Sequence, residues 1–275
     1  MEQKRRFTIG FIGLGHMGLA IARGAATKEY VERYEIAVYD PSVRTAKLCQ
    51  EESFTQLNSE KEVAENCHIV LLAVTPQHIE EVLDHLKGAD IQCLLSIVTG
   101  VSIGHLQEKL GKVPVIRAMP NTPLQIGEGA TALCMSENCP ADDYDFVFKL
   151  FSSMGLARTL KESQLTEAVA LNGSTPAYFY YVVHCLMEDA VERGIDEEAA
   201  RALIVQTMIG SGKLLQENRT KPLADMIDEV CTKGGTTIEA IQSLKDQNLK
   251  NVFHEADEKC IHRAEELGSN YSPIG

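Results

Sequence analysis

Hydrophobic positions follow two patterns along the chain, and the pattern changes near residue 162. Up to there, short apolar runs of strand length alternate with stretches in which apolar residues recur at helical spacing. Strands that alternate with helices in this way predict a parallel sheet with helices on both of its faces. The strand-length runs are Phe7–Ile12, Glu35–Tyr39, His68–Val74, Gln92–Val98, Val113–Ala118, Ala130–Met135 and Leu156–Leu160.

Beyond residue 162 the helical spacing dominates, and clusters of β-branched residues become rare. Gly194 followed by Asp196 predicts a helix end and a new N-cap. We therefore expect an α/β fold class with two domains, an α/β domain over residues 1–162 and an all-α domain over residues 163–275. The expected helices of the second domain span residues 164–191, 196–217, 221–229 and 237–267, and Ser269–Gly275 resembles a loose tail.

The composition is that of a soluble globular protein, with 44% hydrophobic and 24% charged residues. The formal net charge of -13 argues against nucleic acid and anionic membranes as partners, because phosphate groups are bound by basic surfaces. No apolar run approaches the ~20 residues that span a bilayer. The charged start of the chain leads directly into the first strand, so we expect no signal peptide.

Eight cysteines are spread along the chain without a Cys-x-x-Cys spacing, and several lie inside apolar runs of strand length. A reduced thiol behaves there as a small hydrophobic group. The eight histidines show no metal-binding spacing either. The sequence therefore predicts a cytoplasmic protein with free thiols and without a metal site.

A glycine-rich segment with Gly13, Gly15 and Gly18 follows the first strand directly and opens the first helix. In a dinucleotide-binding turn, the first glycine permits the tight bend and the second lets the pyrophosphate approach the backbone. The third lets the helix pack on the strand. We therefore predict that the first domain is a Rossmann-type sheet that binds a nicotinamide dinucleotide. His16 and Met17, which lie between the glycines, belong to the predicted cofactor site.

Asp40 ends the second strand, 22 residues after Gly18, and is the expected partner of the ribose hydroxyl groups of NAD. Its carboxylate would repel the 2′-phosphate of NADP. Arg44 lies four residues later and is suited to hold that phosphate, although an ion pair between the two side chains is an equally good interpretation. The sequence leaves NADH and NADPH open and favours NADH slightly.

Two further segments follow predicted strands, at the sheet edge where ligands bind in open α/β folds. Ala73, Val74, Thr75 and Pro76 end the third strand, although the proline could simply terminate it. A rigid loop with two prolines follows the fifth strand. Its Asn121 either faces the nicotinamide or caps the turn, and we favour the first role.

A second candidate site lies in the other half of the chain. Residues 232–237 read Thr-Lys-Gly-Gly-Thr-Thr and precede an amphipathic helix with Ile238, Ile241 and Leu244 on its apolar face. A glycine-rich turn before a helix leaves backbone N–H groups unpaired at the positive end of the helix dipole, which suits a carboxylate. Residues 172–177 predict a helix kink that either frees backbone groups for a ligand or is a packing bend.

These motifs occur together in one family. Gly-x-Gly-x-x-Gly, Ala-Val-x-Pro, Arg-Ala-Met-Pro-Asn-Thr-Pro, Gly-Ser-x-Pro-Ala-Tyr and Thr-x-Gly-Gly-Thr-Thr appear in this order and spacing. The chain thereby resembles the pyrroline-5-carboxylate reductases over nearly its whole length. The resemblance implies an oxidoreductase that reduces the cyclic C=N bond of 1-pyrroline-5-carboxylate to L-proline with NADH or NADPH, in proline biosynthesis. It also implies a helical domain that interlocks with that of a second subunit, in a homodimer or larger homo-oligomer.

The resemblance also assigns roles to single residues. It places the substrate carboxylate at Gly235, Thr236 and Thr237, and Thr237 is our first choice for a catalytic residue that hydrogen-bonds the ring nitrogen or the carboxylate. Further matching positions are Glu162 near the substrate, Thr232 in place of the usual serine, and Asn58 near the adenosine ribose.

Two departures from the family pattern concern charge. Thr75 stands where a lysine is common, so a cation near the cofactor is missing, and Lys233 stands where proline is usual. Three other functions remain open: a reductase of another cyclic imine such as piperideine carboxylate, a β-hydroxyacid dehydrogenase, and a non-catalytic NAD(P)-binding sensor. The dehydrogenase is disfavoured, because its catalytic lysine would lie between Lys161 and Lys213, where this chain has none.

Overall fold

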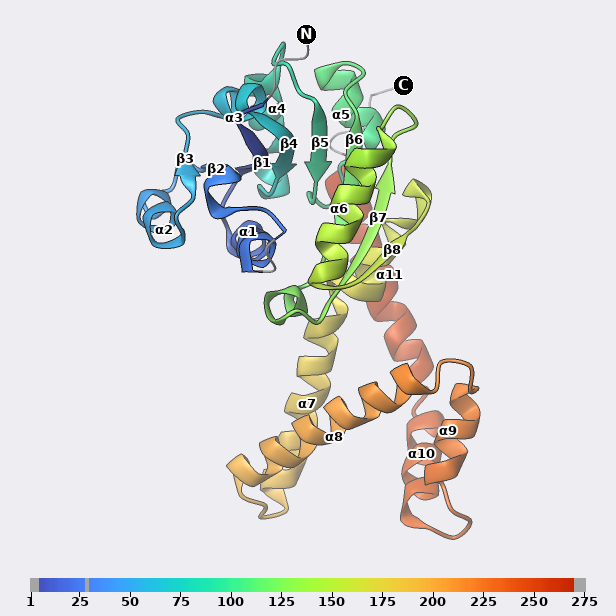
Figure 1. Cartoon of the computed structure of the whole chain (residues 1–275). Helices are drawn as coiled ribbons and strands as arrows, with labels where there is room; N and C mark the ends of the chain where they lie inside the picture. The colour runs from blue at the N-terminus through green and yellow to red at the C-terminus, as the bar shows by residue number, and fades with distance from the viewer. Residues whose placement is uncertain (1–4, 28–29, 270–275) are drawn as a thin grey trace. The chain divides into compact units, whose positions relative to one another are not determined.

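The computed structural model describes residues 5–27 and 30–269 of the chain, which form two compact units. The sheet unit takes in the chain up to Pro176 and again from Cys260, and the helical unit is Ala177–Lys259 (Figure 1). This division follows packing, and the expected domain boundary at residue 162 stays a prediction. The expected tail lies, beyond Ser269, outside the described residues.

An eight-stranded sheet forms the centre of the sheet unit, in the order β3-β2-β1-β4-β5-β6-β7-β8. Neighbouring strands are parallel except for β6 and β7. The predicted α/β fold class, with a Rossmann-type sheet followed by a helical region, is confirmed. The strands are β1 Phe7–Ile12, β2 Ile36–Tyr39, β3 Thr55–Gln56, β4 Cys67–Leu72, β5 Cys93–Ser96, β6 Val115–Met119, β7 Gly129–Met135 and β8 Gly155–Thr159.

The antiparallel step corrects the expectation of a sheet that is parallel throughout. Ile116 of β6 lies opposite Met135 of β7, and the strands run in opposite directions. The connection between them is short and holds the 3-10 helix η3 Thr122–Ile126. A parallel neighbour would need a crossover of about a dozen residues or more, so the chain turns back on itself here. Strand β3 was also not expected, because two residues carry no readable periodicity.

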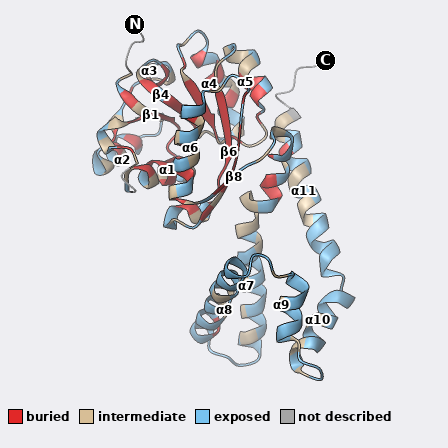
Figure 2. Ribbon diagram, turned by 45° about the vertical axis from the view of Figure 1, so that its right-hand side comes forward, coloured by how far each residue is buried: buried red, intermediate tan, exposed pale blue. Residues whose placement is uncertain are grey.

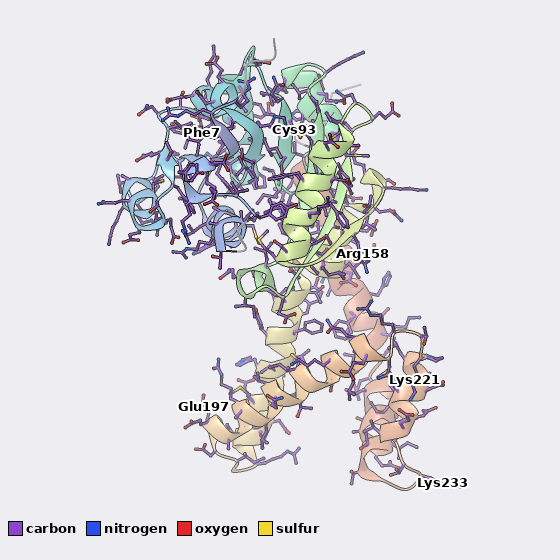
Figure 3. The ribbon with its side chains drawn as sticks, in the orientation of Figure 1. Phe7, Cys93, Arg158, Glu197, Lys221 and Lys233 are labelled. Carbon is purple, nitrogen blue, oxygen red and sulfur yellow. The ribbon has the colours of Figure 1, made fainter. Side chains whose placement is uncertain are left out.

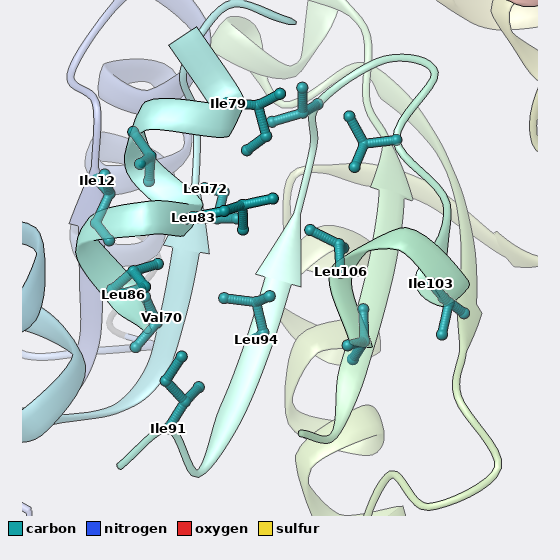
Figure 4. Close-up of a cluster of buried hydrophobic side chains, with 14 of the residues drawn as sticks. Ile12, Val70, Leu72, Ile79, Leu83, Leu86, Ile91, Leu94, Ile103 and Leu106 are labelled. Atoms are coloured by element: carbon teal, nitrogen blue, oxygen red, sulfur yellow. The ribbon is translucent and has the colours of Figure 1, made fainter. Parts of the chain in front are cut away.

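Helices cover both faces of the sheet and enclose two buried apolar clusters. On one face, α4 places Ile79, Leu83 and Leu86 against strand residues that include Val70 and Leu94 (Figure 4). Each fully buried Leu or Ile contributes about 1.5–3 kcal/mol relative to an exposed one. The helices of this region are α1 His16–Thr27, η1 Arg33–Glu35, α2 Thr45–Glu52, α3 Glu60–Asn66, η2 Pro76–His78, α4 Ile79–Leu86, α5 Ile103–Leu110 and α6 Ala141–Ser153.

The remaining helices are α7 Thr175–Glu192, α8 Glu197–Glu217, α9 Leu223–Val230, α10 Thr236–Asp246 and α11 Leu249–Ser269. Asp196 caps α8 by accepting a hydrogen bond from the backbone N–H of Ala199 at 3.0 Å, which confirms the predicted N-cap. The expected single helix over residues 237–267 is wrong. Asn248 adopts a φ of 54°, a left-handed conformation that asparagine tolerates, and it separates α10 from α11.

The chain before α7 also differs from the expected continuous helix over residues 164–191. It holds the 3-10 helix η4 Glu162–Gln164 and the π-helical turn η5 Val169–Gly173, and α7 begins only at Thr175. Pro176 therefore lies in the first turn of a helix, where no backbone N–H donor is needed, and not at a kink within one.

The helical unit has almost no core of its own. Ala200 is the single buried residue among the described residues 177–259, and most of the unit is drawn in the colour of exposed residues in Figure 2. Phe179 and Leu203 are exposed and help to line an apolar groove of about 550 Å³. A unit without a core cannot offset the entropy lost on folding, so another surface must cover it. No described helix is long and apolar enough to cross a bilayer.

Candidate cofactor cleft and anion-binding loop

The glycine-rich turn between β1 and α1 has the shape that a dinucleotide requires. Gly13 adopts a φ of 96°, and a Cβ atom there would lie 2.7 Å from the carbonyl oxygen of Ala73. A Cβ atom on Gly18 would lie 2.6 Å from the carbonyl oxygen of Gly13. A Cβ atom on Gly15, in contrast, would meet no atom of the described residues within 4 Å apart from its chain neighbours. Gly13 and Gly18 thus serve packing, and Gly15 leaves room for a ligand to approach the backbone.

A cleft of about 380 Å³ opens beside this turn, at the carboxyl ends of parallel strands of the sheet. The N-terminus of α1, with its unpaired N–H groups, belongs to the same wall and suits a pyrophosphate. Pro76 starts η2 and is not among the described residues that line the cleft. The predicted cofactor residues in the lining are Gly15, His16, Met17, Ala73, Val74 and Thr75.

Sequence reasoning did not assign the other lining residues to the site. Ile97 and Thr99 follow β5, so the rule that ligands bind at the carboxyl ends of strands was sufficient to find them. Gly173 and Ser174 belong to residues 172–177, for which the sequence predicts either freed backbone groups or a packing bend. Val169 comes from the π-helical turn η5, for which the sequence gives no signal. The full set of missed residues is Ile97, Thr99, Met119, Pro120, Val169, Gly173 and Ser174.

Asp40 joins the glycine-rich turn to the start of α2. One carboxylate oxygen accepts a hydrogen bond from the backbone N–H of Leu14 at 2.7 Å, and the other accepts one from the N–H of Ser42 at 2.8 Å. The Thr45 hydroxyl donates to the second oxygen at 3.3 Å. Among the described residues, Asp40 and Arg44 form no ion pair, and Arg44 is exposed at the N-cap position of α2. The carboxylate is therefore fixed by the backbone and not by its neighbouring cation.

Asn58 lies just beyond β3, the strand next to β2. Its backbone and side-chain N–H groups both donate to the carboxylate of Glu62, at 2.8 Å and 3.0 Å. Asn58 follows the carboxyl end of β3, which pairs in parallel with β2. It therefore lies on the side of the sheet that the predicted ribose contact requires. Its contact with the ribose stays a prediction.

Asn121 is buried, with 8% of its surface exposed, and its amide holds two parts of the chain together. The side-chain oxygen accepts a hydrogen bond from the N–H of Ala130 at 2.8 Å, and the side-chain nitrogen donates to the carbonyl oxygen of Asn172 at 3.1 Å. Both polar atoms are thus engaged within the protein, where they tie the loop to β7 and to η5. The Asn121 side chain makes no capping hydrogen bond at the start of η3, so the alternative role of a turn cap is wrong. A direct contact with the nicotinamide stays a prediction.

Glu162, the first residue of η4, is held by two donors. Its carboxylate accepts from the backbone N–H of Ile103 at 2.6 Å and from the Nη1 atom of Arg117 at 3.0 Å. The carboxylate therefore caps the start of α5 and neutralises a guanidinium that is buried in the sheet unit. Glu162 is outside the described lining of the cofactor cleft, and its expected place near the substrate stays a prediction.

The turn before α10 is built around its two glycines. Gly234 adopts a φ of 75°, and the N–H of Gly235 donates to the carbonyl oxygen of Thr232 at 2.9 Å. Lys233 extends from this turn between α9 and α10 and adds a positive charge (Figure 3). A side chain at position 235 would force Thr232 to shift, because a Cβ atom there would lie 2.5 Å from the hydroxyl oxygen and 3.0 Å from the carbonyl oxygen of Thr232.

The N-terminus of α10 is left open for an anion. Its N-cap residue is Gly235, which has no side chain to accept from the first N–H groups of the helix. The N–H groups of Thr236 and Thr237 therefore have no side-chain acceptor at the N-cap, and both residues add a hydroxyl group. This geometry agrees with the predicted carboxylate site, whose occupant stays a prediction. Among the described residues, no group of three His, Cys, Asp or Glu side chains is placed to hold a metal ion.

A glycine-rich turn beside a cleft at the carboxyl ends of parallel strands defines a dinucleotide-dependent oxidoreductase. Two family models match separate parts of the chain. Residues 8–100 match the model described as "NADP oxidoreductase coenzyme F420-dependent", and residues 162–267 match "Pyrroline-5-carboxylate reductase dimerisation".

Individual relatives cover nearly the whole chain. The pyrroline-5-carboxylate reductase of Escherichia coli (strain K12) is 32% identical over 98% of this chain and 100% of its own. The solved structure of Plasmodium falciparum pyrroline carboxylate reductase with NADP bound covers 97% of this chain and 100% of its own, with 29% identity and a TM-score of 0.88. The pyrroline-5-carboxylate reductase of Coxiella burnetii covers 96% and 99%, with 30% identity and a TM-score of 0.84. The chain belongs to the pyrroline-5-carboxylate reductase family, as its motifs predict.

Proposed function

We propose that this protein reduces 1-pyrroline-5-carboxylate to L-proline with NADH or NADPH, as a step of proline biosynthesis. The observation that carries the proposal is a pair of ligand-binding elements in one chain: the open backbone at Gly15 beside the cleft, and the uncapped N-terminus of α10. The first fits a dinucleotide and the second a small carboxylate. The names of the relatives support this choice of substrate.

When bound, the dinucleotide supplies the hydride that the carbon of the C=N bond accepts. We propose that Gly235, Thr236 and Thr237 hold the substrate carboxylate through the first N–H groups of α10, with Thr232 and Glu162 close to the substrate. Thr237 also hydrogen-bonds the ring nitrogen or the carboxylate. An iminium ring is already an electrophile, so the main contributions of the chain are orientation and the exclusion of water.

We propose further that the chain works as a homodimer or larger homo-oligomer. The uncovered apolar groove of the helical unit and the match of residues 162–267 to a dimerisation model support an association of identical chains. We also place the protein in the cytoplasm. All eight cysteines are unpaired, as in a reducing compartment, and burial raises the pKa of Cys67 to about 12, which keeps that thiol protonated.

The decisive experiment is the initial rate of NADH and NADPH oxidation with 1-pyrroline-5-carboxylate, beside the six-membered homologue piperideine-6-carboxylate. We expect kcat/KM to be at least about tenfold higher with the five-membered ring, since one methylene group in a fitted pocket changes specificity by about 10–200-fold. A preference for the larger ring would assign the protein to another cyclic imine. Oxidation with neither ring, by protein that binds the dinucleotide, would refute the reductase and favour a sensor.

Thr237 is tested separately. Thr237→Ala should lower kcat/KM for the imine by about tenfold or more, because a hydrogen bond to a charged group contributes about 1.5–3 kcal/mol. Thr220→Ala is the matched control, since Thr220 is exposed between α8 and α9. If Thr237→Ala retains the full kcat/KM, the catalytic role of this residue is excluded.

A further inference from the structure

The fixed carboxylate of Asp40 has room for more acceptor contacts than it makes. An ionised carboxylate offers about four acceptor positions, and the contacts from Leu14, Ser42 and Thr45 use three of them. The two backbone contacts come from the glycine-rich turn and from the loop before α2. The carboxylate is therefore held beside the turn that binds the dinucleotide, in a position that costs no side-chain ordering when a ligand arrives.

The surroundings of Asp40 are acidic. The pKa of the neighbouring Tyr39 phenol is raised, first by burial and then by the charges of Glu60, Asp40 and Glu81. Glu62 adds another carboxylate at the same edge, where it accepts both N–H groups of Asn58. This end of β2 and β3 thus has a negative potential, produced by residues from several elements and not by Asp40 alone.

Cations to balance this charge are few in the described part of the chain. Arg44 is exposed at the start of α2, where an ion pair with a ligand phosphate would be weakened by solvent and by the loss of side-chain freedom. The described lining of the cofactor cleft contains no lysine or arginine, and Thr75 is the polar residue that follows β4 there. Neither Arg44 nor the described lining of the cleft therefore provides a buried positive charge for a phosphate group.

We propose that NADH is the coenzyme of this protein and that Asp40 is the residue that determines the choice. The ribose hydroxyl groups of NADH donate to the carboxylate, whereas NADPH brings a 2′-phosphate with a charge of about −1.5 to −2 towards the Asp40 carboxylate and an acidic edge. This inference rests on the proposed function only in assuming that the ligand is a nicotinamide dinucleotide. The residues that recognise it all belong to the sheet unit.

Binding is measured without the imine, by fluorescence titration of the whole protein with NADH and with NADPH. We expect the Kd for NADH to be about tenfold or more below that for NADPH at low salt. The two Kd values should move closer together when the ionic strength is raised, because salt screens the repulsion between the phosphate and the carboxylates. Equal affinities, or tighter binding of NADPH, would overturn the inference.

Two variants distinguish the effect of the negative charge from the effect of losing the hydrogen bonds of Asp40. Asp40→Ser should reduce the NADH preference by about tenfold, although it also removes the contacts with Leu14, Ser42 and Thr45. Glu62→Gln leaves those contacts intact and should reduce the preference by about two- to threefold, since it removes one carboxylate from the same edge. Asp84→Asn is the control, because Asp84 is an exposed carboxylate of α4 that pairs with Lys87. If neither Asp40→Ser nor Glu62→Gln changes the ratio, the carboxylates do not set it.

The two proposals fail in different ways. Preferential binding of NADH with no turnover of 1-pyrroline-5-carboxylate would reject the proposed reaction and keep the coenzyme inference. Turnover that is faster with NADPH, together with tighter NADPH binding, would keep the reaction and reject the inference.

Discussion

Thr232 and Gly235 approach each other so closely in the turn before α10 that a Cβ atom at position 235 would lie 2.5 Å from the Thr232 hydroxyl oxygen. Gly235→Ala must therefore displace Thr232, either by rotating its side chain or by moving the turn that precedes the first N–H groups of α10. We expect KM for the imine to rise by about tenfold or more, since hydrogen bonds to a carboxylate contribute about 1.5–3 kcal/mol each. KM for the coenzyme should stay unchanged, because the cleft belongs to the sheet unit.

The control for this substitution is Gly104→Ala in α5. A Cβ atom on Gly104 would have the Ser102 hydroxyl oxygen at 3.8 Å, an ordinary contact, as its nearest neighbour in the described residues. Gly104→Ala should leave both KM values as they are. An equal rise of both KM values in Gly235→Ala would show a general loss of structure and contradict the assignment of the turn to the substrate.

Alanine substitutions at Gly15 and Gly18 should affect different properties, dinucleotide binding in the first case and stability in the second. Gly15→Ala adds a Cβ atom where the described residues leave space, so the free energy of unfolding should change by less than about 1 kcal/mol while dinucleotide binding weakens strongly. Gly18→Ala places its Cβ atom 2.6 Å from the carbonyl oxygen of Gly13 and should destabilise the fold itself, by about 1–3 kcal/mol. Urea unfolding and NADH titration of both variants measure the two effects. Unchanged NADH affinity in Gly15→Ala would mean that the ligand does not approach this glycine.

Asn121→Ala should cost stability, because it leaves the N–H of Ala130 and the carbonyl oxygen of Asn172 without their side-chain partner. The expected loss in the free energy of unfolding is about 1–3 kcal/mol. Gln125→Ala in the same loop is the control, since Gln125 is exposed, and should stay within about 0.5 kcal/mol of the wild type. Equal unfolding free energies for Asn121→Ala and the control would show that the amide does not fix the loop.

The pH dependence of stability should include a contribution from Glu52. Burial disfavours its charge, but hydrogen bonds and charge from Arg23 and Arg33 outweigh burial and lower the pKa of this carboxyl group. A lowered native pKa means that the unfolded chain binds the proton more readily. The ion pairs therefore stabilise the protein above the unfolded value of about 4.3, and this stabilisation disappears as the pH falls through the lower native value.

Glu52→Gln isolates that contribution. The variant should be less stable than the wild type at neutral pH, and the difference should shrink on acidification below about pH 4.3. Glu51→Gln is the neighbouring control, because Glu51 forms only an exposed pair with Lys47 at 3.5 Å. A stability difference that is constant from neutral to acidic pH would contradict the lowered pKa of Glu52.

Local chemistry allowed much of the site to be predicted from the sequence. The turn requires glycine at Gly13 and Gly18 because of backbone conformation and close approach, and the structure has that geometry, with open space at Gly15. Thr75 lines the cleft because it follows a parallel strand, as the strand-end rule predicts. The open N-terminus of α10 likewise follows from Gly235, a residue without a side chain.

Features set by distant contacts could not be predicted in this way. The buried hydrogen bonds of Asn121 depend on Ala130 and Asn172, which no spacing in the sequence connects to it. The antiparallel direction of β7 follows from the length of one connection, whereas the apolar pattern of the strand is the same in either direction. The break at Asn248 is a single left-handed residue inside a helical periodicity that continues on both sides.

Because Ala200 alone is buried among the described residues 177–259, the association that we propose links the stability of the protein to its concentration. The sheet unit has its own core, whereas the helical unit would gain one from a second chain in the homo-oligomer that we propose. Its melting temperature must then rise with protein concentration, since association stabilises the folded state by mass action. Dilution should therefore unfold the helical unit before the sheet unit, and a smaller fraction of the chains should be folded at low concentration than at high concentration.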